Sequence, residues 1–131
     1  MVVPLTNHIV RVSSFNANSV QGAARRDAVL NLNSQCDILL LQETRLGILE
    51  TFSFDSLFPR SIFSTPVDDR PRHGHTTSGP SSGVGILFSA KIMSHVESVT
   101  RVLDLEHRAV AARVIFSSGK SMFVASVYAP S

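Results

Sequence analysis

A helix-length segment lies between two short apolar segments near the start of the chain, and this arrangement limits the possible folds more than any other feature. Residues 9–15 carry closely spaced, β-branched apolar side chains that favour a strand entering a core. Residues 37–42 form a second strand-length segment that is apolar almost throughout. Residues 20–34, between them, have apolar side chains at helical spacing. Strand, helix and strand in this order predict two parallel strands joined by a right-handed crossover.

The predicted helix would run for about four turns. Its expected buried stripe consists of small and aliphatic residues at helical spacing: Ala24, Ala28, Val29 and Leu32. Before it, residues 16–19 are rich in Asn and Ser and indicate a turn. Asn18 or Ser19 is therefore expected to cap the helix.

Polar side chains follow both predicted parallel strands, at Asn16 and at Glu43. Functional residues of such sheets gather at the carboxyl ends of the strands, so this amide and this carboxylate should meet at one rim. A carboxylate held by a buried strand is a good ligand for a hard cation such as Mg²⁺. The alternative is that Glu43 simply begins a surface loop.

The rest of the chain favours antiparallel sheet. Residues 65–82 are rich in Pro, Gly, Ser and Thr and predict a long surface loop without a domain boundary. Strands are expected at residues 84–89, 96–103, 109–116 and 122–128. The last two are separated by Ser117, Ser118, Gly119 and Lys120, a link that predicts a hairpin.

Composition limits the function classes. The hydrophobic content of 44% and charged content of 17% predict one globular domain rather than a disordered chain. The net charge is only +2, from 12 Lys and Arg against 10 Asp and Glu, so nucleic acid would not be bound by overall charge and phosphate binding must be local. The lone Cys36 predicts a buried structural thiol in a reduced, intracellular protein. Neither a secretory signal nor a membrane span is expected.

The weaker candidate sites are expected to have no catalytic or metal-binding role. His73 and His75 form a His-x-His pair without further ligands nearby, so a solvated loop is preferred over a metal site. Asp68 and Asp69 are expected to be solvated in the same loop. Residues 117–120 fit Ser-x-x-Lys, but on a hairpin turn a nucleophilic serine is not expected.

Four short motifs resemble those of the endonuclease/exonuclease/phosphatase superfamily. In chain order they are Ser14-Phe15-Asn16, then residues 37–44 ending in Gln42-Glu43-Thr44, then residues 83–88, and finally Val127-Tyr128-Ala129-Pro130. Their order and spacing are most similar to the endonuclease domain at the front of LINE-type retrotransposon polyproteins. The resemblance runs from about Ile9 to Ser131.

The resemblance implies a mixed α/β (α+β) fold, a four-layer sandwich of two packed mixed β-sheets with outer helices. It implies that Glu43 binds Mg²⁺, or alternatively Mn²⁺, which would polarise a scissile phosphate. Asn16 would help to position that glutamate, the metal or the phosphate. Tyr128 would donate a hydrogen bond to a phosphate oxygen. The implied partner is the phosphate backbone of DNA, with a downstream reverse transcriptase in the parent polyprotein and a nuclear location.

Two departures from the family pattern matter. A glycine usually stands where this chain has Ser19. The Gly-Asp-x-Asn and Ser-Asp-His motifs of the family's second half do not occur, so residues 1–131 are expected to be a domain truncated at its C-terminus, with half an active site and no general base. The fragment alone is then expected not to cut DNA and to expose apolar sheet surface. The competing interpretation is a non-catalytic retroelement remnant or a binding half-domain.

Overall fold

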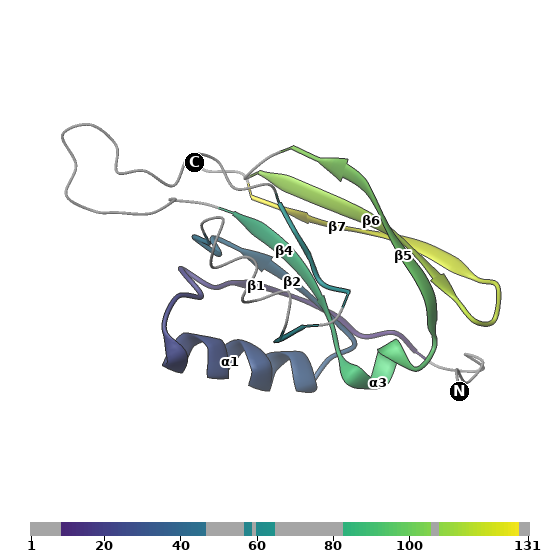
Figure 1. Ribbon diagram of the computed structural model, residues 1–131, viewed down its shortest axis with the longest axis horizontal. Helices are drawn as coiled ribbons and strands as arrows, with labels where there is room; N and C mark the ends of the chain where they lie inside the picture. Colours follow the sequence, from purple (N-terminus) through teal and green to yellow (C-terminus); the bar gives the residue numbers. More distant parts are fainter. Residues whose placement is uncertain (1–8, 47–56, 59, 65–82, 106–107, 129–131) are drawn as a thin grey trace.

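The structure of the chain is a computed structural model that describes residues 9–46, 57–58, 60–64, 83–105 and 108–128 (Figure 1). Along these residues the order of elements is β1 (Val12–Asn16), α1 (Ala23–Ser34), β2 (Ile38–Gln42), β3 (Ile62–Phe63), β4 (Val84–Phe88), α3 (Ala90–Met93), β5 (Val96–Asp104), β6 (Ala109–Phe116) and β7 (Ser121–Val127). Neither helix among them has the length and apolar character needed to cross a membrane.

Sheet A contains the parallel pair that the sequence predicts. Its strand order is β1-β2-β4-β3. β1 and β2 are parallel, in a register that runs from Val12 opposite Ile38 to Asn16 opposite Gln42, and α1 connects them. β4 is antiparallel to both of its neighbours, β2 and β3. Sheet A is therefore mixed, with the carboxyl ends of β1 and β2 at the same rim.

Sheet B has the order β5-β6-β7 and is entirely antiparallel. The predicted hairpin is confirmed: β6 and β7 pair directly, and Gly119 in the link has a φ of 88°, which glycine adopts without strain. β5 is less regular, because its register with β6 shifts between Val96 and Ser98 and again between Arg101 and Leu103. Such irregularities bend a strand and disrupt its edge.

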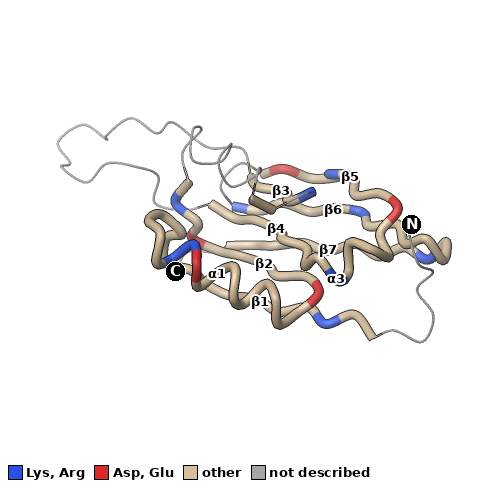
Figure 2. Tube along the Cα trace, turned by 60° about the horizontal axis from the view of Figure 1, so that its bottom comes forward, with Lys and Arg blue, Asp and Glu red and all other residues tan. Residues whose placement is uncertain are grey.

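The two sheets pack face to face, with α1 on the other side of sheet A (Figures 1 and 2). The core between the sheets includes Ile38, Ile86, Phe88, Val110, Val114 and Val124. The core between sheet A and α1 includes Val29, Leu39, Leu41 and Leu87. Full burial of one such side chain stabilises the fold by roughly 1.5–3 kcal/mol. The result is the expected mixed α/β architecture with two packed sheets.

The outer face of sheet B has no helix over it in the part of the chain that the structure describes (Figure 1). Phe123 on this face is 68% exposed and Val127 is 58% exposed. The expected exposure of apolar sheet surface is thus observed on this side of the molecule.

Part of the expected buried stripe of the helix and its expected cap are wrong. Val29 and Leu32 of that stripe do pack against the core beside sheet A. Ala24 and Ala28 are exposed, and the residues of α1 that are buried against sheet A are Val29 and Asn33. The helix is rotated so that the larger Val29 side chain, and not the alanines, enters the core, because valine buries more apolar area there. The helix begins at Ala23 after Gly22, with no side-chain cap. The expected cap Ser19 instead accepts a hydrogen bond from the Gln21 backbone N–H at 3.2 Å.

Two short elements, β3 and α3, were not expected from the sequence. Ser89, expected at the end of a strand, instead caps α3 by accepting a hydrogen bond from the Ile92 N–H at 3.2 Å. β3 packs so closely on β4 that a Cβ atom at Gly85 would lie 2.7 Å from the Phe63 ring. The predicted loop at residues 65–82 lies outside the described residues.

Candidate functional site

Asn16 lies at the carboxyl end of β1, beside the exit of β2. The parallel pairing continues past both strands, because the Ala17 N–H donates to the Gln42 carbonyl at 2.9 Å and the Ser19 N–H donates to the Glu43 carbonyl at 2.7 Å. These bonds keep the residues after β1 next to the residues after β2. The structure therefore brings Asn16 and Glu43 to one rim, as the strand order predicts.

The turn after Asn16 has a strained backbone. Asn18 has a φ of 46° and Ser19 a φ of 88°, the left-handed region that favours glycine. The Asn16 Oδ1 atom accepts a hydrogen bond from the Asn18 N–H at 3.1 Å, and the Arg25 guanidinium donates to the Asn18 carbonyl at 2.6 Å. Ser19 therefore adopts the conformation that a glycine would take, and the turn is kept by its hydrogen bonds.

Glu43 follows β2 directly and is itself strained, with a φ of 53°. Its side chain is only 18% exposed, and its Oε2 atom lies 3.7 Å from a guanidinium nitrogen of Arg45. Arg45 also has a positive φ, of 54°. Strained residues so close together persist only where the surrounding structure holds them, and they are common at functional sites.

Tyr128 reaches Glu43 from the other sheet. It follows β7, and its backbone N–H donates to the Arg108 carbonyl at 2.8 Å. The Tyr128 hydroxyl lies beside the Glu43 carboxylate, and its interaction with this hydrogen-bond acceptor is the main reason that the pKa of the phenol is raised above its ordinary value. Partial burial and the negative charge of Glu43 act in the same direction, while Arg45 and Arg108 oppose them.

A polar network that the sequence did not predict fastens β7 to β2. The Ser126 hydroxyl donates to the Leu41 carbonyl at 2.6 Å, and the Gln42 side-chain amide donates to the Ser126 Oγ at 3.0 Å. The Ser14 hydroxyl donates to the Gln42 Oε1 at 3.2 Å. The two bonds of Ser126 cross from sheet B to sheet A and help to place Tyr128 beside Glu43, while the Ser14 bond lies within sheet A. The signal that could have found them is a lone polar residue in each of two apolar segments.

Thr44 and Gly83 support Glu43 from the side of β4. Thr44 is 2% exposed, and its N–H donates to the Gly83 carbonyl at 3.1 Å. A Cβ atom at Gly83 would lie 2.4 Å from the Thr44 Oγ1, and Gly83 has a φ of +124°. Both the space and the backbone therefore require glycine at this position.

The donor set at the rim fits a hard divalent cation. Mg²⁺ keeps several waters and needs only one or two carboxylates, together with oxygens of its substrate. Glu43 offers a carboxylate, and the Asn16 Oδ1 atom, which accepts one hydrogen bond, has a second lone pair available. Among the described residues no group of three or more His, Cys, Asp or Glu side chains gathers. Glu43 is thus the carboxylate that would hold a metal at this rim.

Cys36 and Ser117 do not join this site. Cys36 is buried, and burial raises the pKa of its thiol, as befits an unreactive structural cysteine. Ser117, the serine of the Ser-x-x-Lys pattern, donates its hydroxyl to the His95 carbonyl at 3.3 Å. The pairs Asp68 and Asp69, and His73 and His75, lie outside the described residues.

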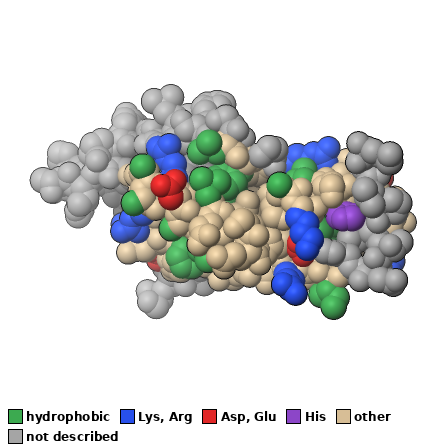
Figure 3. All heavy atoms as spheres, turned by 90° about the horizontal axis from the view of Figure 1, so that it is seen from below, with side chains coloured by type: hydrophobic (Ala, Val, Ile, Leu, Met, Phe, Trp, Pro, Cys, Tyr) green, Lys and Arg blue, Asp and Glu red, His purple; other side chains and the backbone are tan. Residues whose placement is uncertain are grey.

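Charged side chains are scattered over the face of the molecule that Figure 3 shows. Lys and Arg side chains are dispersed over this face rather than gathered in a patch.

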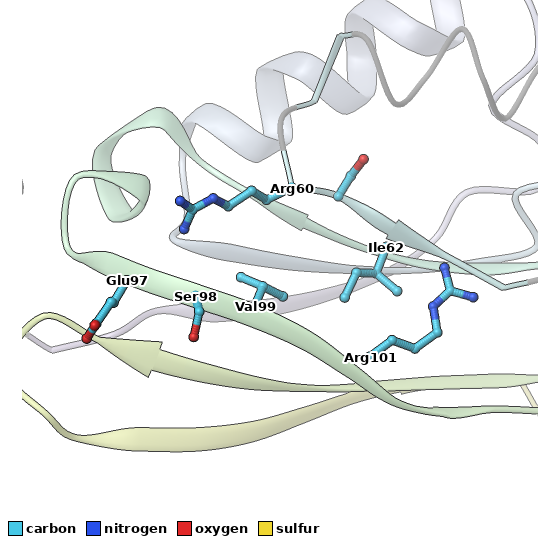
Figure 4. A pocket seen from close by; sticks show the side chains of 7 residues that line it. Arg60, Ile62, Glu97, Ser98, Val99 and Arg101 are labelled. Carbon is cyan, nitrogen blue, oxygen red and sulfur yellow. The ribbon is translucent and has the colours of Figure 1, made fainter.

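Figure 4 shows a pocket of about 450 Å³ between β3 and β5, with Arg60 and Arg101 directed to different sides. Arg60 donates to the Val96 carbonyl at 3.2 Å, Arg101 pairs with Asp104 at 2.5 Å, and Glu97 adds a negative charge. Both arginines of this pocket thus already make hydrogen bonds to other groups of the protein.

Comparisons with known proteins bear on the family and the fold of the chain. The sequence model of the Endonuclease/Exonuclease/phosphatase family matches residues 13–127. A variant of the 3′ phosphatase NExo from Neisseria, solved with a product DNA hairpin, is 21% identical with a TM-score of 0.51, and the match covers 92% of this chain and 41% of that one. The AP endonuclease LMAP from Leishmania major is 18% identical with a TM-score of 0.56, covering 97% of this chain and 45% of that one. The chain thus shares their fold and spans less than half of their length. No curated protein matches the chain in sequence.

Proposed function

The chain belongs to the endonuclease/exonuclease/phosphatase family, and on that basis we propose that it forms the part of a metal-dependent phosphodiesterase that holds the metal and the scissile phosphate of DNA. The observation that carries this proposal is the meeting of Glu43 and Tyr128, which come from different sheets, at the rim that also holds Asn16. An acidic residue, an amide and a phenol at one rim are the groups that a metal-bound phosphate needs.

DNA is the proposed substrate because the two similar structures are a phosphatase with a product DNA hairpin and an AP endonuclease. The order and spacing of the four motifs support the narrower proposal of a LINE-type retrotransposon endonuclease. That context would place the protein in the nucleus and join it to a downstream reverse transcriptase. Residues 1–131 would then be the front part of a longer nuclease domain.

In this proposal Glu43 and Asn16 hold Mg²⁺, or Mn²⁺ in its place, through oxygen atoms. A bound ion would polarise the phosphate and stabilise the charge that develops on the leaving oxygen. Tyr128 donates to a phosphate oxygen. Its hydroxyl lies beside Glu43, so it would be free to donate to a phosphate oxygen if that carboxylate held the metal.

The competing function is binding without catalysis. It is favoured by the lack of any cluster of three or more acidic, histidine or cysteine side chains among the described residues. A general base for the attacking water would have to come from elsewhere. We propose that residues 1–131 alone bind metal and phosphate but do not cleave DNA.

Two measurements on the purified chain test the proposed function. The first follows nicking of supercoiled plasmid in Mg²⁺ with and without EDTA, and EDTA-sensitive nicking would refute the proposed inactivity of the fragment. The second follows NMR signals of Asn16 and Tyr128 while a short DNA duplex is added in Mg²⁺. Both sets of signals are expected to be perturbed by DNA in the unmodified chain. In Tyr128→Phe the perturbation of the Asn16 signals is expected to be weaker. A spectrum unchanged by DNA would contradict phosphate binding at this rim.

A further inference from the structure

Another cavity lies at the end of sheet A that is far from the candidate site. It has a volume of about 530 Å³ and is lined by the end of α1, residues 57–58 and the junction of β4 with α3. In Figure 1, α3 lies beside the carboxyl end of α1. Phe88 of this cavity pairs with Ile38 at the start of β2, whereas Glu43 follows the end of that strand. The cavity is therefore separate from the rim that carries Glu43.

The lining of this cavity is mainly apolar. Phe58 and Phe88 are both buried and form the aromatic part of its wall. Leu30 and Leu57 also line it and are 40% and 46% exposed. Cavities of roughly 300–1,000 Å³ with apolar and aromatic linings and a few polar groups are typical of small-molecule sites. Because aromatic rings pack favourably against one another, a flat aromatic molecule suits this lining.

One buried polar atom of the lining has no hydrogen-bond partner. Asn33, near the end of α1, is 7% exposed, and its side-chain amide donates to the Phe88 carbonyl at 3.3 Å. A carbonyl oxygen only accepts hydrogen bonds, so this contact fixes the orientation of the amide and leaves the Asn33 Oδ1 atom unpaired. A buried acceptor without a partner costs free energy, and a ligand N–H group would remove that cost.

A ligand must displace side chains to reach this oxygen, because the Asn33 Oδ1 atom is closed off from solvent. Leu30 precedes Asn33 by three residues, so the two side chains are neighbours on one face of α1. Exposed side chains change rotamer within nanoseconds, and Met93, elsewhere in the lining, is flexible as well. The ligand can thus approach Asn33 without any movement of α1 or sheet A.

Charge selects the other end of the ligand. Lys91 is exposed and is the only charged residue among the described residues that line the cavity. Its ammonium group attracts an anion and repels a cation, although the energy is modest at an exposed position. A carboxylate at the outer end of the ligand would therefore suit Lys91 while an N–H group at the inner end bonds to Asn33.

We propose that this cavity binds a small aromatic carboxylate that carries one ring N–H group. The N–H donates to the Asn33 Oδ1 atom, the ring packs against Phe58 and Phe88, and the carboxylate lies near Lys91. A second copy of the chain does not offer these groups together, because the chain has no tryptophan and hence no indole ring. The proposal does not depend on metal or phosphate binding at Glu43.

The test compares indole-3-propionate with benzofuran-3-propionate, which has the same shape and carboxylate but a ring oxygen in place of the N–H group. NMR methyl signals of Leu30, Leu57 and Met93 in the purified, isotopically labelled chain follow binding. Indole-3-propionate is expected to shift them in a saturable way and to bind about 3–10-fold more tightly than the benzofuran, which is the effect of one hydrogen bond. Amide signals of Asn16 and Thr100 should stay in place.

Two variants assign the contacts. Asn33→Leu removes the acceptor at similar side-chain size and should bind the two probes with equal affinity. Lys91→Gln should bind both probes about 2–5-fold more weakly, since it removes one exposed ion pair. Lys120→Gln, on the β6–β7 hairpin, is the matched control and should bind as the unmodified chain does. If Asn33→Leu does not fold, the comparison of the two probes in the unmodified chain decides the matter.

Three results would overturn the proposal. The first is equal affinity of the unmodified chain for the two probes, or the lack of a saturable shift with either. The second is a response of Asn16 or Thr100 as large as that of the cavity, which would show that the probes bind elsewhere or without specificity. The third is a set of cavity signals that shifts with the concentration of the chain itself, which would assign the cavity to a second copy.

Discussion

The Tyr128 hydroxyl and the Glu43 carboxylate lie beside each other at the junction of the two sheets, where Glu43 raises the pKa of the phenol. Glu43 follows β2 of sheet A, and Tyr128 follows β7 of sheet B. Their meeting depends on the packing of the sheets and on the bonds of Ser126 and Gln42, so it reports on fold and site together.

Glu43→Gln is expected to lower the pKa of Tyr128. The substitution removes the negative charge and weakens the hydrogen bond that raises the pKa. Tyr128 is the only tyrosine and there is no tryptophan, so ultraviolet absorbance during an alkaline titration reports on this one phenol. Asp104→Asn, which removes a carboxylate on β5, is the control and should leave the pKa of Tyr128 unchanged. An unchanged value in Glu43→Gln would contradict the contact.

The same shift gives a pH dependence of stability. A folded-state pKa above the unfolded value means that the folded chain keeps the Tyr128 proton to higher pH. The contribution is therefore fully present below the unfolded pKa of about 10 and is lost as the pH rises through the folded pKa. Urea unfolding above pH 10 should show a steeper loss of stability for the unmodified chain than for Tyr128→Phe. An equal loss of stability with pH in the unmodified chain and in Tyr128→Phe would contradict this linkage.

Ser126→Ala is expected to destabilise the chain by about 1–3 kcal/mol, because it leaves buried polar groups on β2 without a partner. Ser126 is 1% exposed and bonds to both Leu41 and Gln42. The matched control is Ser121→Ala, at an exposed position on the same strand. Urea denaturation of both variants measures the difference, and equal stabilities would show that the network does not hold the sheets together.

Ser19→Gly is expected to be more stable than Ser19→Ala by roughly 1 kcal/mol. Both variants lose the bond from the Gln21 N–H to the serine hydroxyl, and only glycine relieves the strain of a φ of 88°. The difference in their free energies of unfolding, measured by urea denaturation, thus isolates the effect of backbone strain at residue 19. If alanine were as stable as glycine, the turn after Asn16 would not have the conformation described.

Gly83→Ala is expected to cost roughly 2–4 kcal/mol, from overpacking and backbone strain combined. The new Cβ atom would lie 2.4 Å from the Thr44 Oγ1. Gly119→Ala is the control, because Gly119 also has a positive φ but has open space around its Cβ position. Thermal unfolding should show a clearly larger loss for Gly83→Ala, and similar losses would mean that Thr44 does not pack against this glycine.

Local pattern was enough to predict much of the fold. The apolar segments and the helix between them predicted the parallel pair, and the glycine-containing link predicted the β6–β7 hairpin. The buried face of α1 was not predictable from spacing alone, since Ala24 and Val29 both fit a helical stripe and only contact with sheet A selects Val29. β3 spans two residues and is stabilised by its neighbour β4, so no periodic signal precedes it.

The candidate site was predictable to a different degree at each residue. Asn16 and Glu43 were placed together by the rule for strand ends, which needs only the strand order. Tyr128 was identified as a candidate only from the family resemblance, because its approach to Glu43 depends on how sheet B packs on sheet A. The roles of Arg25 and Ser126 depend on tertiary hydrogen bonds between segments far apart in the chain. Such bonds produce no repeating pattern of residues from which they could be predicted.

The central claim is that Glu43 and Asn16 bind a divalent cation beside Tyr128. The most direct measurement follows the Tyr128 ring and Asn16 side-chain NMR signals while Mn²⁺, which broadens signals close to it, is added at neutral pH. The account predicts selective broadening of both signals, reversal by excess Mg²⁺, and loss of the effect in Glu43→Gln but not in Asp104→Asn. If the signals stay sharp in the unmodified chain, or broaden equally in Glu43→Gln, the claim is wrong.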